Sequence, residues 1–305
     1  MEFGKLDNIE NVDFSLPSDH KMTGLTLSKG QNMGKSKHLY IGCTGWGVKE
    51  WVGEVYPKGA KAADYLHHYG KQFNTIELNT THYRTPSVFD IEKWYQQTPA
   101  DFKFAPKMLQ TISHAKNLEF GSGLTPQFCE AIGGLKEKMG ICFMQMPPYF
   151  QYNDLKILEL YLKFFPDNIR LAIELRHKEW FNTPQYLTTL TDMLKAYTVS
   201  TVITDVAGRR DVLHQCLTTK TAVIRFVGND LHPTDYSRLE DWVQRLKIWY
   251  AAGLDEAYFF THTSDNINAP KLAKFLHNNF LSHVKGVSIR APQFLNNEPI
   301  QISLF

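Results

Sequence analysis

Short apolar segments recur along the chain from residue 39 onward, and several of them end in polar or aromatic residues. They are rich in Val, Ile, Phe and Tyr and are bounded by Gly, Pro, Asn or Asp, a pattern typical of buried strands. The predicted strands are Leu39–Thr44, Asn74–Asn79, Phe102–Lys107, Gly140–Gln145, Ile169–Leu175, Val199–Thr204, Thr221–Val227 and Ala257–Thr261.

Segments with helical periodicity lie between most of these strands. The predicted helices are Ala60–Gln72, Ser87–Gln97, Thr125–Lys138, Asp154–Phe165, Pro184–Ala196, Asp235–Ala252 and Ala269–Phe280. The sixth unit is the least regular, because Gly208, Arg209 and Arg210 precede any helical run there. Alternating strands and helices imply a parallel sheet with crossover helices. We therefore predict an α/β fold, a single (β/α)₈ TIM-like barrel.

The segments that flank the predicted barrel differ from it in composition. Residues 1–37 are polar and weakly periodic, so we expect an N-terminal extension, a polar arm that packs on the main domain. The barrel itself is predicted to span residues 38–290, and residues 291–305 form a predicted C-terminal tail.

Composition argues against several classes of protein. The net charge of +2 provides no global basic field for nucleic acid or an anionic membrane, although a local basic pocket is compatible with it. The cysteines show no metal-ligand spacing and suit a reducing compartment. Residues 1–34 contain no long apolar stretch, so we expect no signal peptide and no membrane span. The sequence favours a cytoplasmic protein.

Polar side chains lie at the carboxyl ends of the predicted strands, where α/β barrels bind ligands. Side chains alternate between the faces of a strand, so Glu77 and Asn79 share one face, and Glu174 and Arg176 share another. Because charged groups rarely face a helix layer, we expect both pairs to point into the barrel mouth. Lys107, Gln145, Asp205 and Arg225 end their strands at comparable depth.

These residues allow acid/base chemistry, anion binding, or both. The candidate catalytic residues are Glu77, Glu174, His114 and Asp205, because carboxylates in different surroundings can divide acid and base roles. Lys107, Arg176 and Arg225 could hold a phosphate or carboxylate group. The candidate substrate-binding residues are Trp46, Asn79, Tyr83, Arg84, Lys107, Gln145, Arg176, Trp180 and Arg225, whose aromatic members could stack on a base or sugar ring. The alternative is a structural salt-bridge network, with the aromatic residues as core.

Histidines follow four of the predicted strands. His82, His114, His177 and His262 could form a divalent metal site with Glu77, Glu174 and Asp205. The sequence contains no H-x-H and no H-E-x-x-H motif, so hydrogen-bonded loop histidines are the alternative.

Many of these segments resemble the YecE-like family, whose domain has no settled activity. The resemblance rests on Ile41–Trp46, Lys49–Trp51, Val55–Pro57, Phe73–Pro86, Trp94 with Thr98-Pro99, Phe102–Lys107, Ser113-His114, Ile173–Arg176, Trp180-Phe181, Asp205, Arg225-Phe226 and Gly228. It implies a TIM-like barrel, similar in fold alone to metal-dependent sugar isomerases and abasic-site endonucleases. The chain departs from the family at Gly47, where many members have Ser, and at Thr261-His262, where members often have two asparagines.

The C-terminal residues are similar to the peptide with which bacterial replication and repair proteins dock on the sliding clamp. Leu304 and Phe305 would enter an apolar cleft, and Gln301 would form hydrogen bonds. The alternative is a tail that packs under the barrel.

Together these features predict an enzyme that acts on a phosphorylated or nucleic-acid-related substrate by hydrolysis or acid/base chemistry. The alternative is a non-catalytic DNA-maintenance adaptor that docks the clamp. Pocket burial distinguishes the two, because an enzyme needs its carboxylates in an accessible cleft, whereas an adaptor tolerates a pocket sealed by salt bridges.

Overall fold

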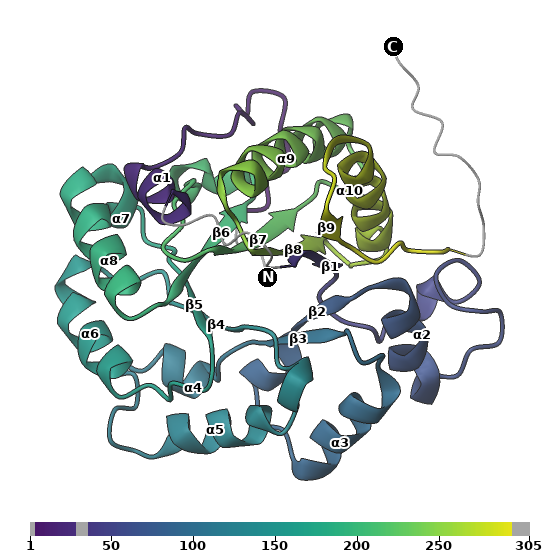
Figure 1. The fold of residues 1–305 in the computed structure, drawn as a ribbon, viewed down its shortest axis with the longest axis horizontal. Coiled ribbons are helices and arrows are strands. Elements are labelled where there is room, and N and C mark those ends of the chain that lie inside the picture. Colours follow the sequence, from purple (N-terminus) through teal and green to yellow (C-terminus); the bar gives the residue numbers. More distant parts are fainter. Residues whose placement is uncertain (1–3, 29–35, 295–305) are drawn as a thin grey trace.

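The computed structural model describes residues 4–28 and 36–294 (Figure 1). Each predicted strand segment contains a strand, and the paired strands run parallel. The strands are β1 (Lys37–Gly42), β2 (Thr75–Leu78), β3 (Lys103–Pro106), β4 (Cys142–Gln145), β5 (Leu171–Glu174), β6 (Ser200–Asp205), β7 (Thr221–Val227), β8 (Glu256–His262) and β9 (Val287–Ser288).

The strands form two ladders instead of one closed barrel. A seven-stranded sheet has the order β4-β5-β6-β7-β8-β1-β9, and β2 pairs with β3 separately. The predicted closed barrel is therefore not confirmed, and the fold is a mixed α/β fold with a mostly parallel sheet.

Side chains interrupt the ladder between β1 and β2. The Asn74 amide bonds the N–H of Ile41 and the carbonyl of Leu39, and the Tyr69 hydroxyl lies between the N–H of Cys43 and the carbonyl of Thr75. These two side chains replace direct backbone hydrogen bonds between β1 and β2. Gly42 is required here, because a Cβ atom at this position would collide with the Thr75 carbonyl oxygen.

Helices surround the strands on the outside (Figure 1). They are α1 (Lys21–Leu27), α2 (Tyr65–Gln72), α3 (Val88–Gln97), α4 (Gln110–Ser113), α5 (Leu124–Gly133), α6 (Leu155–Lys163), α7 (Glu179–Asn182), α8 (Pro184–Ala196), α9 (Pro233–Ala252) and α10 (Ala269–His283). The irregular sixth unit forms a 3₁₀ helix at Ala207–Val212 in place of an α-helix. Within the described residues, no helix is both long and apolar enough to cross a membrane.

The strands have two differently packed faces. On the outer face, Ile203, Ile224 and Phe259 belong to the same hydrophobic cluster as residues of α9 and α10. Alternate residues form a separate inner cluster that contains no helix residue, and its members are Tyr40, Ala105, Ile141, Phe143, Ala172, Val202, Val223, Tyr258 and Phe260. Because β1 and β3 to β8 all contribute, the strands enclose this inner cluster.

The N-terminal arm packs along the Ala207–Val212 segment and α9. The guanidinium of Arg210 donates to the carbonyls of Asp13, Phe14 and Ser15. Thr23 and Thr26 donate to the carbonyls of Gln215 and Leu217. The predicted clamp-docking residues Gln301, Leu304 and Phe305 lie outside the described residues, so that prediction stays untested.

Asp205 faces the helix layer, and its predicted position in the barrel mouth is wrong. The register pairs Thr204 with Arg225 and Asp205 with Phe226, which belongs to the outer cluster. The Asp205 carboxylate accepts hydrogen bonds from Arg238 and from the Trp242 indole, both at 2.8 Å and both on α9. A charged residue is tolerated on this face because α9 and Arg210 supply its partners.

Asp205→Ala should lower the free energy of unfolding by about 3–5 kcal/mol, because the substitution leaves the buried guanidinium of Arg238 without its principal partner. Urea unfolding measures this change. The matched control is Asp211→Ala, which removes a more exposed partner of Arg209 and should change stability by about 0.5 kcal/mol or less. An unchanged unfolding midpoint for Asp205→Ala would contradict a structural role.

Candidate functional site

The inner face of the strands changes from apolar to polar toward their carboxyl ends. Each of several polar residues lies two positions beyond a residue of the inner cluster and therefore shares its face. These residues are Lys107, Gln145, Glu174, Thr204, Arg225 and His262, which follow Ala105, Phe143, Ala172, Val202, Val223 and Phe260. The inner cluster is thus followed, toward the carboxyl ends of the strands, by polar side chains on the same face, which we call the polar layer.

Arg225 links the two candidate carboxylates. Its Nε and Nη2 atoms donate to the two oxygens of Glu77 at 2.8 and 2.9 Å, and its Nη1 atom donates to Glu174 at 2.8 Å. The Nε atom of Arg176 donates to the other oxygen of Glu174 at 2.9 Å. We call these four residues the charge cluster. It joins the ends of β2, β5 and β7.

Two more side chains contact Glu77. The amide of Asn79 donates to Oε1 of Glu77 at 2.9 Å, and the Nε2 atom of His262 lies 3.0 Å from Oε2. Asn79 follows β2, and His262 ends β8. Glu77 thus accepts bonds from three different side chains, which fixes its orientation and that of the His262 ring.

The surrounding charges keep both carboxylates ionised. Burial alone would raise the pKa of Glu77, but Arg225 and His262 hold it well below its usual range. Burial opposes ionisation of Glu174 too, yet Arg176, Arg225 and Lys107 lower its pKa to about 2. Neither group is therefore a proton donor at neutral pH, and the anion-binding role expected for Arg225 is already taken by the two glutamates.

Lys107 and two histidines border the charge cluster. The Nζ atom of Lys107 donates to Oε1 of Gln145 at 3.0 Å. The Nδ1–H of His82 donates to the Met108 carbonyl, 2.7 Å away, and the ring lies beside that of His114. Burial and the charge of Lys107 lower the pKa of both rings, that of His82 to about 4. Both imidazoles are neutral at physiological pH.

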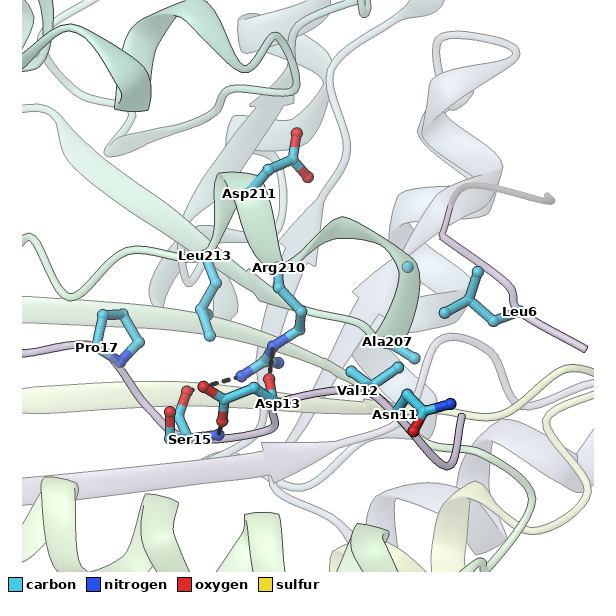
Figure 2. A pocket seen from close by; sticks show the side chains of 11 residues that line it. Leu6, Asn11, Val12, Asp13, Ser15, Pro17, Ala207, Arg210, Asp211 and Leu213 are labelled. Atoms are coloured by element: carbon cyan, nitrogen blue, oxygen red, sulfur yellow. Dashed lines mark hydrogen bonds between the residues drawn. The ribbon is translucent and has the colours of Figure 1, made fainter. Parts of the chain in front are cut away.

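The charge cluster is largely covered. The exposed fractions are 0% for Glu77 and 1% for Glu174, whereas the His262 side chain is 14% exposed. The carboxylates therefore do not line an accessible cleft, and their burial argues against an enzyme in which these carboxylates act directly on the substrate. A hollow of about 610 Å³ lies elsewhere, between residues 6–17 of the arm and residues 207–213 (Figure 2). None of the residues that line it belongs to the charge cluster.

The structure separates several other predicted residues from this site. Trp180 is completely buried and donates its indole N–H to the Phe150 carbonyl at 2.9 Å, so it is core. Arg84 forms a surface ion pair with Asp90 at the start of α3. Trp46 is half-buried and packs edge-on against Trp94. Tyr83 is 74% exposed, but its ring lies edge-on against that of His82, so Tyr83 stays beside the site.

The four histidines that were candidates for a metal site do not gather. His262 contacts Glu77, His82 and His114 lie together, and His177 lies 3.9 Å from Glu179. In the described part of the chain, no group of three or more His, Cys, Asp or Glu side chains is placed to hold a metal ion.

The pairing of His262 with Glu77 was not predicted from the sequence. The available signal was the alternation Tyr258, Phe260, His262, which places the imidazole on the inner face of β8. Thr204 was also missed, and its buried hydroxyl has no hydrogen-bond partner in the described part of the chain. It lies beside Arg225 in the register and is a further polar group on this face.

Arg225→Met should destabilise the protein at pH 7 by about 3–5 kcal/mol, because two buried carboxylates lose their shared partner. Both carboxylates have depressed pKa values in the folded protein, so their contribution to stability is present above the unfolded pKa and is lost as the pH falls. The difference between variant and wild type should therefore narrow from pH 7 to pH 3 in urea unfolding.

The control for this comparison is Arg84→Met, which breaks an exposed pair and should have nearly the same stability as wild type at every pH. A stability difference for Arg225→Met that is small at pH 7, or that grows in acid, would contradict the ion-pair interpretation.

Comparisons with known proteins agree with this architecture. The UPF0759 protein YecE of Escherichia coli K12 is 29% identical over 256 residues, which cover 78% of this chain and 91% of YecE. The UPF0759 protein YunF of Bacillus subtilis 168 is 28% identical over 168 residues, 51% of this chain and 56% of YunF.

Solved structures support the fold. A DUF72 family protein of Enterococcus faecalis V583 superimposes with a TM-score of 0.66 at 17% identity, covering 86% of this chain and 99% of that protein. A DUF72 family protein of Thermotoga maritima MSB8 gives a TM-score of 0.57 at 24% identity, covering 79% and 99%. The family model described as protein of unknown function DUF72 matches residues 40–296. The chain therefore belongs to the DUF72 family, and the YecE-like resemblance is confirmed.

Proposed function

We propose that the protein is an acid/base enzyme in which His262 transfers a proton and Glu77 orients His262. The substrate we propose carries an anionic group, as phosphorylated and nucleic-acid-related compounds do. The observation that carries this proposal is the 3.0 Å contact between Nε2 of His262 and Oε2 of Glu77. A histidine held by an ionised carboxylate has a fixed ring orientation and a stabilised protonated form, which suits general acid/base catalysis.

The roles of the carboxylates differ from those expected from sequence. Glu77 and Glu174 are ionised and bonded to arginine, so they act through their charge and their geometry. His262 is more exposed than any of the four residues of the charge cluster, so we propose that substrate approaches over this ring. Burial lowers the pKa of His262, and Glu77 partly offsets this effect. Because burial outweighs the effect of Glu77, His262 is a neutral base at physiological pH.

The charge of Lys107 supports the choice of an anionic substrate. Its ammonium group lies near the guanidinium of Arg225 and donates to the neutral amide of Gln145. The electrostatic field of the site therefore favours a phosphate or carboxylate group near Lys107 and His114. A neutral imidazole such as His114 can donate a hydrogen bond to the same group.

We infer that the two ladders form one continuous TIM-like barrel wall over residues 38–290, with the arm at 1–37 and the tail at 291–305. Two backbone hydrogen bonds support this inference, from Glu77 N–H to the Cys43 carbonyl at 3.0 Å and from Met108 N–H to the Phe143 carbonyl at 2.9 Å. The buried free cysteines suit a cytoplasmic location. Docking of the sliding clamp stays a prediction from the C-terminal peptide.

The proposal is tested with sugar phosphates, nucleotides and an oligonucleotide that contains an abasic site, with products followed by mass spectrometry. We expect wild type to convert a member of one class, and His262→Asn to lose activity by about 100-fold or more because the proton-transfer group is gone. His283→Asn changes an exposed histidine of α10 and should keep full activity. Turnover that is undiminished in His262→Asn would contradict the assignment.

A further inference from the structure

Two buried lysines of this chain have very different surroundings. Lys138 is 4% exposed, and its amine donates to the carbonyls of Tyr95 and Thr98 and to the Thr98 hydroxyl. Lys107 is 2% exposed, and within residues 4–28 and 36–294 its amine has one acceptor, the neutral amide oxygen of Gln145. An ammonium group has three donors to satisfy, so Lys138 is in a site built for a cation, whereas Lys107 is not.

The neighbouring carboxylates do not supply the missing partners of Lys107. Arg225 occupies both oxygens of Glu77 and one of Glu174, and Arg176 occupies the other. Among the charged groups around Lys107, Arg225 and Arg176 disfavour an additional positive charge, whereas Glu77 and Glu174 offset part of this effect. Burial, followed by the charge of Arg225, lowers the pKa of Lys107 to about 8.

We propose that Lys107 is a nucleophilic amine that condenses with the aldehyde or ketone carbon of an anionic substrate. This inference rests on the site of the proposed function and specifies its substrate class as a phosphorylated or carboxylated carbonyl compound. A lysine becomes nucleophilic when it is desolvated or lies next to another cation, and Lys107 meets both conditions. The single bond to Gln145 holds the amine in place at the carboxyl end of β3.

The chemical step balances without a further reagent. The nitrogen lone pair of the neutral amine attacks the carbonyl carbon, and a carbinolamine forms. The carbonyl oxygen then leaves as water with one amine hydrogen and one proton taken from solvent, and a protonated carbon–nitrogen double bond remains. The protonated imine withdraws electrons from the adjacent carbon, so a C–H bond there becomes acidic and is within the chemistry of a histidine base such as His262.

Reductive trapping with glyoxylate and sodium cyanoborohydride at pH 7 tests the proposal on the intact protein. Glyoxylate is a small anionic aldehyde, and reduction of its imine leaves a carboxymethyl group that peptide mass spectrometry locates. At pH 7 about one tenth of an amine with a pKa near 8 is neutral, compared with less than about one thousandth at the usual value. We expect Lys107 to be modified at least about tenfold faster than Lys61, which is exposed, and Lys138 to stay unmodified.

Three controls make the outcome decisive. Urea-unfolded protein should be modified at all three lysines, which shows that each peptide is detected. Lys107→Arg keeps the charge, removes the nucleophile and should abolish the fast modification. His262→Asn should still be trapped at Lys107, so loss of turnover and loss of trapping can be told apart.

Modification of folded wild-type protein at Lys61 but not at Lys107 would overturn the proposal, and the proposed role of His262 would stand. Trapping at Lys107 together with undiminished turnover in His262→Asn would support the nucleophilic role of Lys107 and contradict the proposed role of His262.

Discussion

The bidentate pairing of Arg225 with Glu77, extended to Glu174, is the interaction on which the site depends. It connects strands of both ladders, since Glu77 lies on β2 while Glu174 and Arg225 lie on β5 and β7. Buried charges are costly unless each is matched in geometry and hydrogen bonding. Arg225 at the centre keeps both carboxylates ionised, and the other polar side chains of this face pack around them.

Two consequences of this pairing underlie the proposed roles of His262 and Lys107. Glu77 keeps an oxygen close to the His262 ring and orients it. Because the arginines occupy the carboxylates, Lys107 is left with the neutral amide of Gln145. The same ion pairs therefore orient an imidazole and leave a buried amine beside a neutral acceptor.

The sequence predicted the parts of this structure that depend on short-range periodicity. The strand positions follow from apolar segments, and the two-residue period places Glu77 with Asn79 and Glu174 with Arg176. Asp205 was misplaced because its face is set by register and by α9, which supplies Arg238 and Trp242 from far along the chain. Likewise, Asn74 and Tyr69 insert between β1 and β2, and isolated bridges replace a regular ladder between β3 and β4, so a closed ladder does not form. Burial of the charge cluster also depends on tertiary packing, so periodicity could not reveal it.

The most direct test of this account is an NMR titration of the His262 ring in wild type and in Glu77→Gln. The account predicts a pKa below the ordinary value of 6.5 in wild type, because burial outweighs the attraction of Glu77. It also predicts a further decrease in Glu77→Gln, because the carboxylate charge that favours the protonated ring is removed. A His262 pKa that does not change on substitution of Glu77 would show that the two groups are not coupled and would contradict the account.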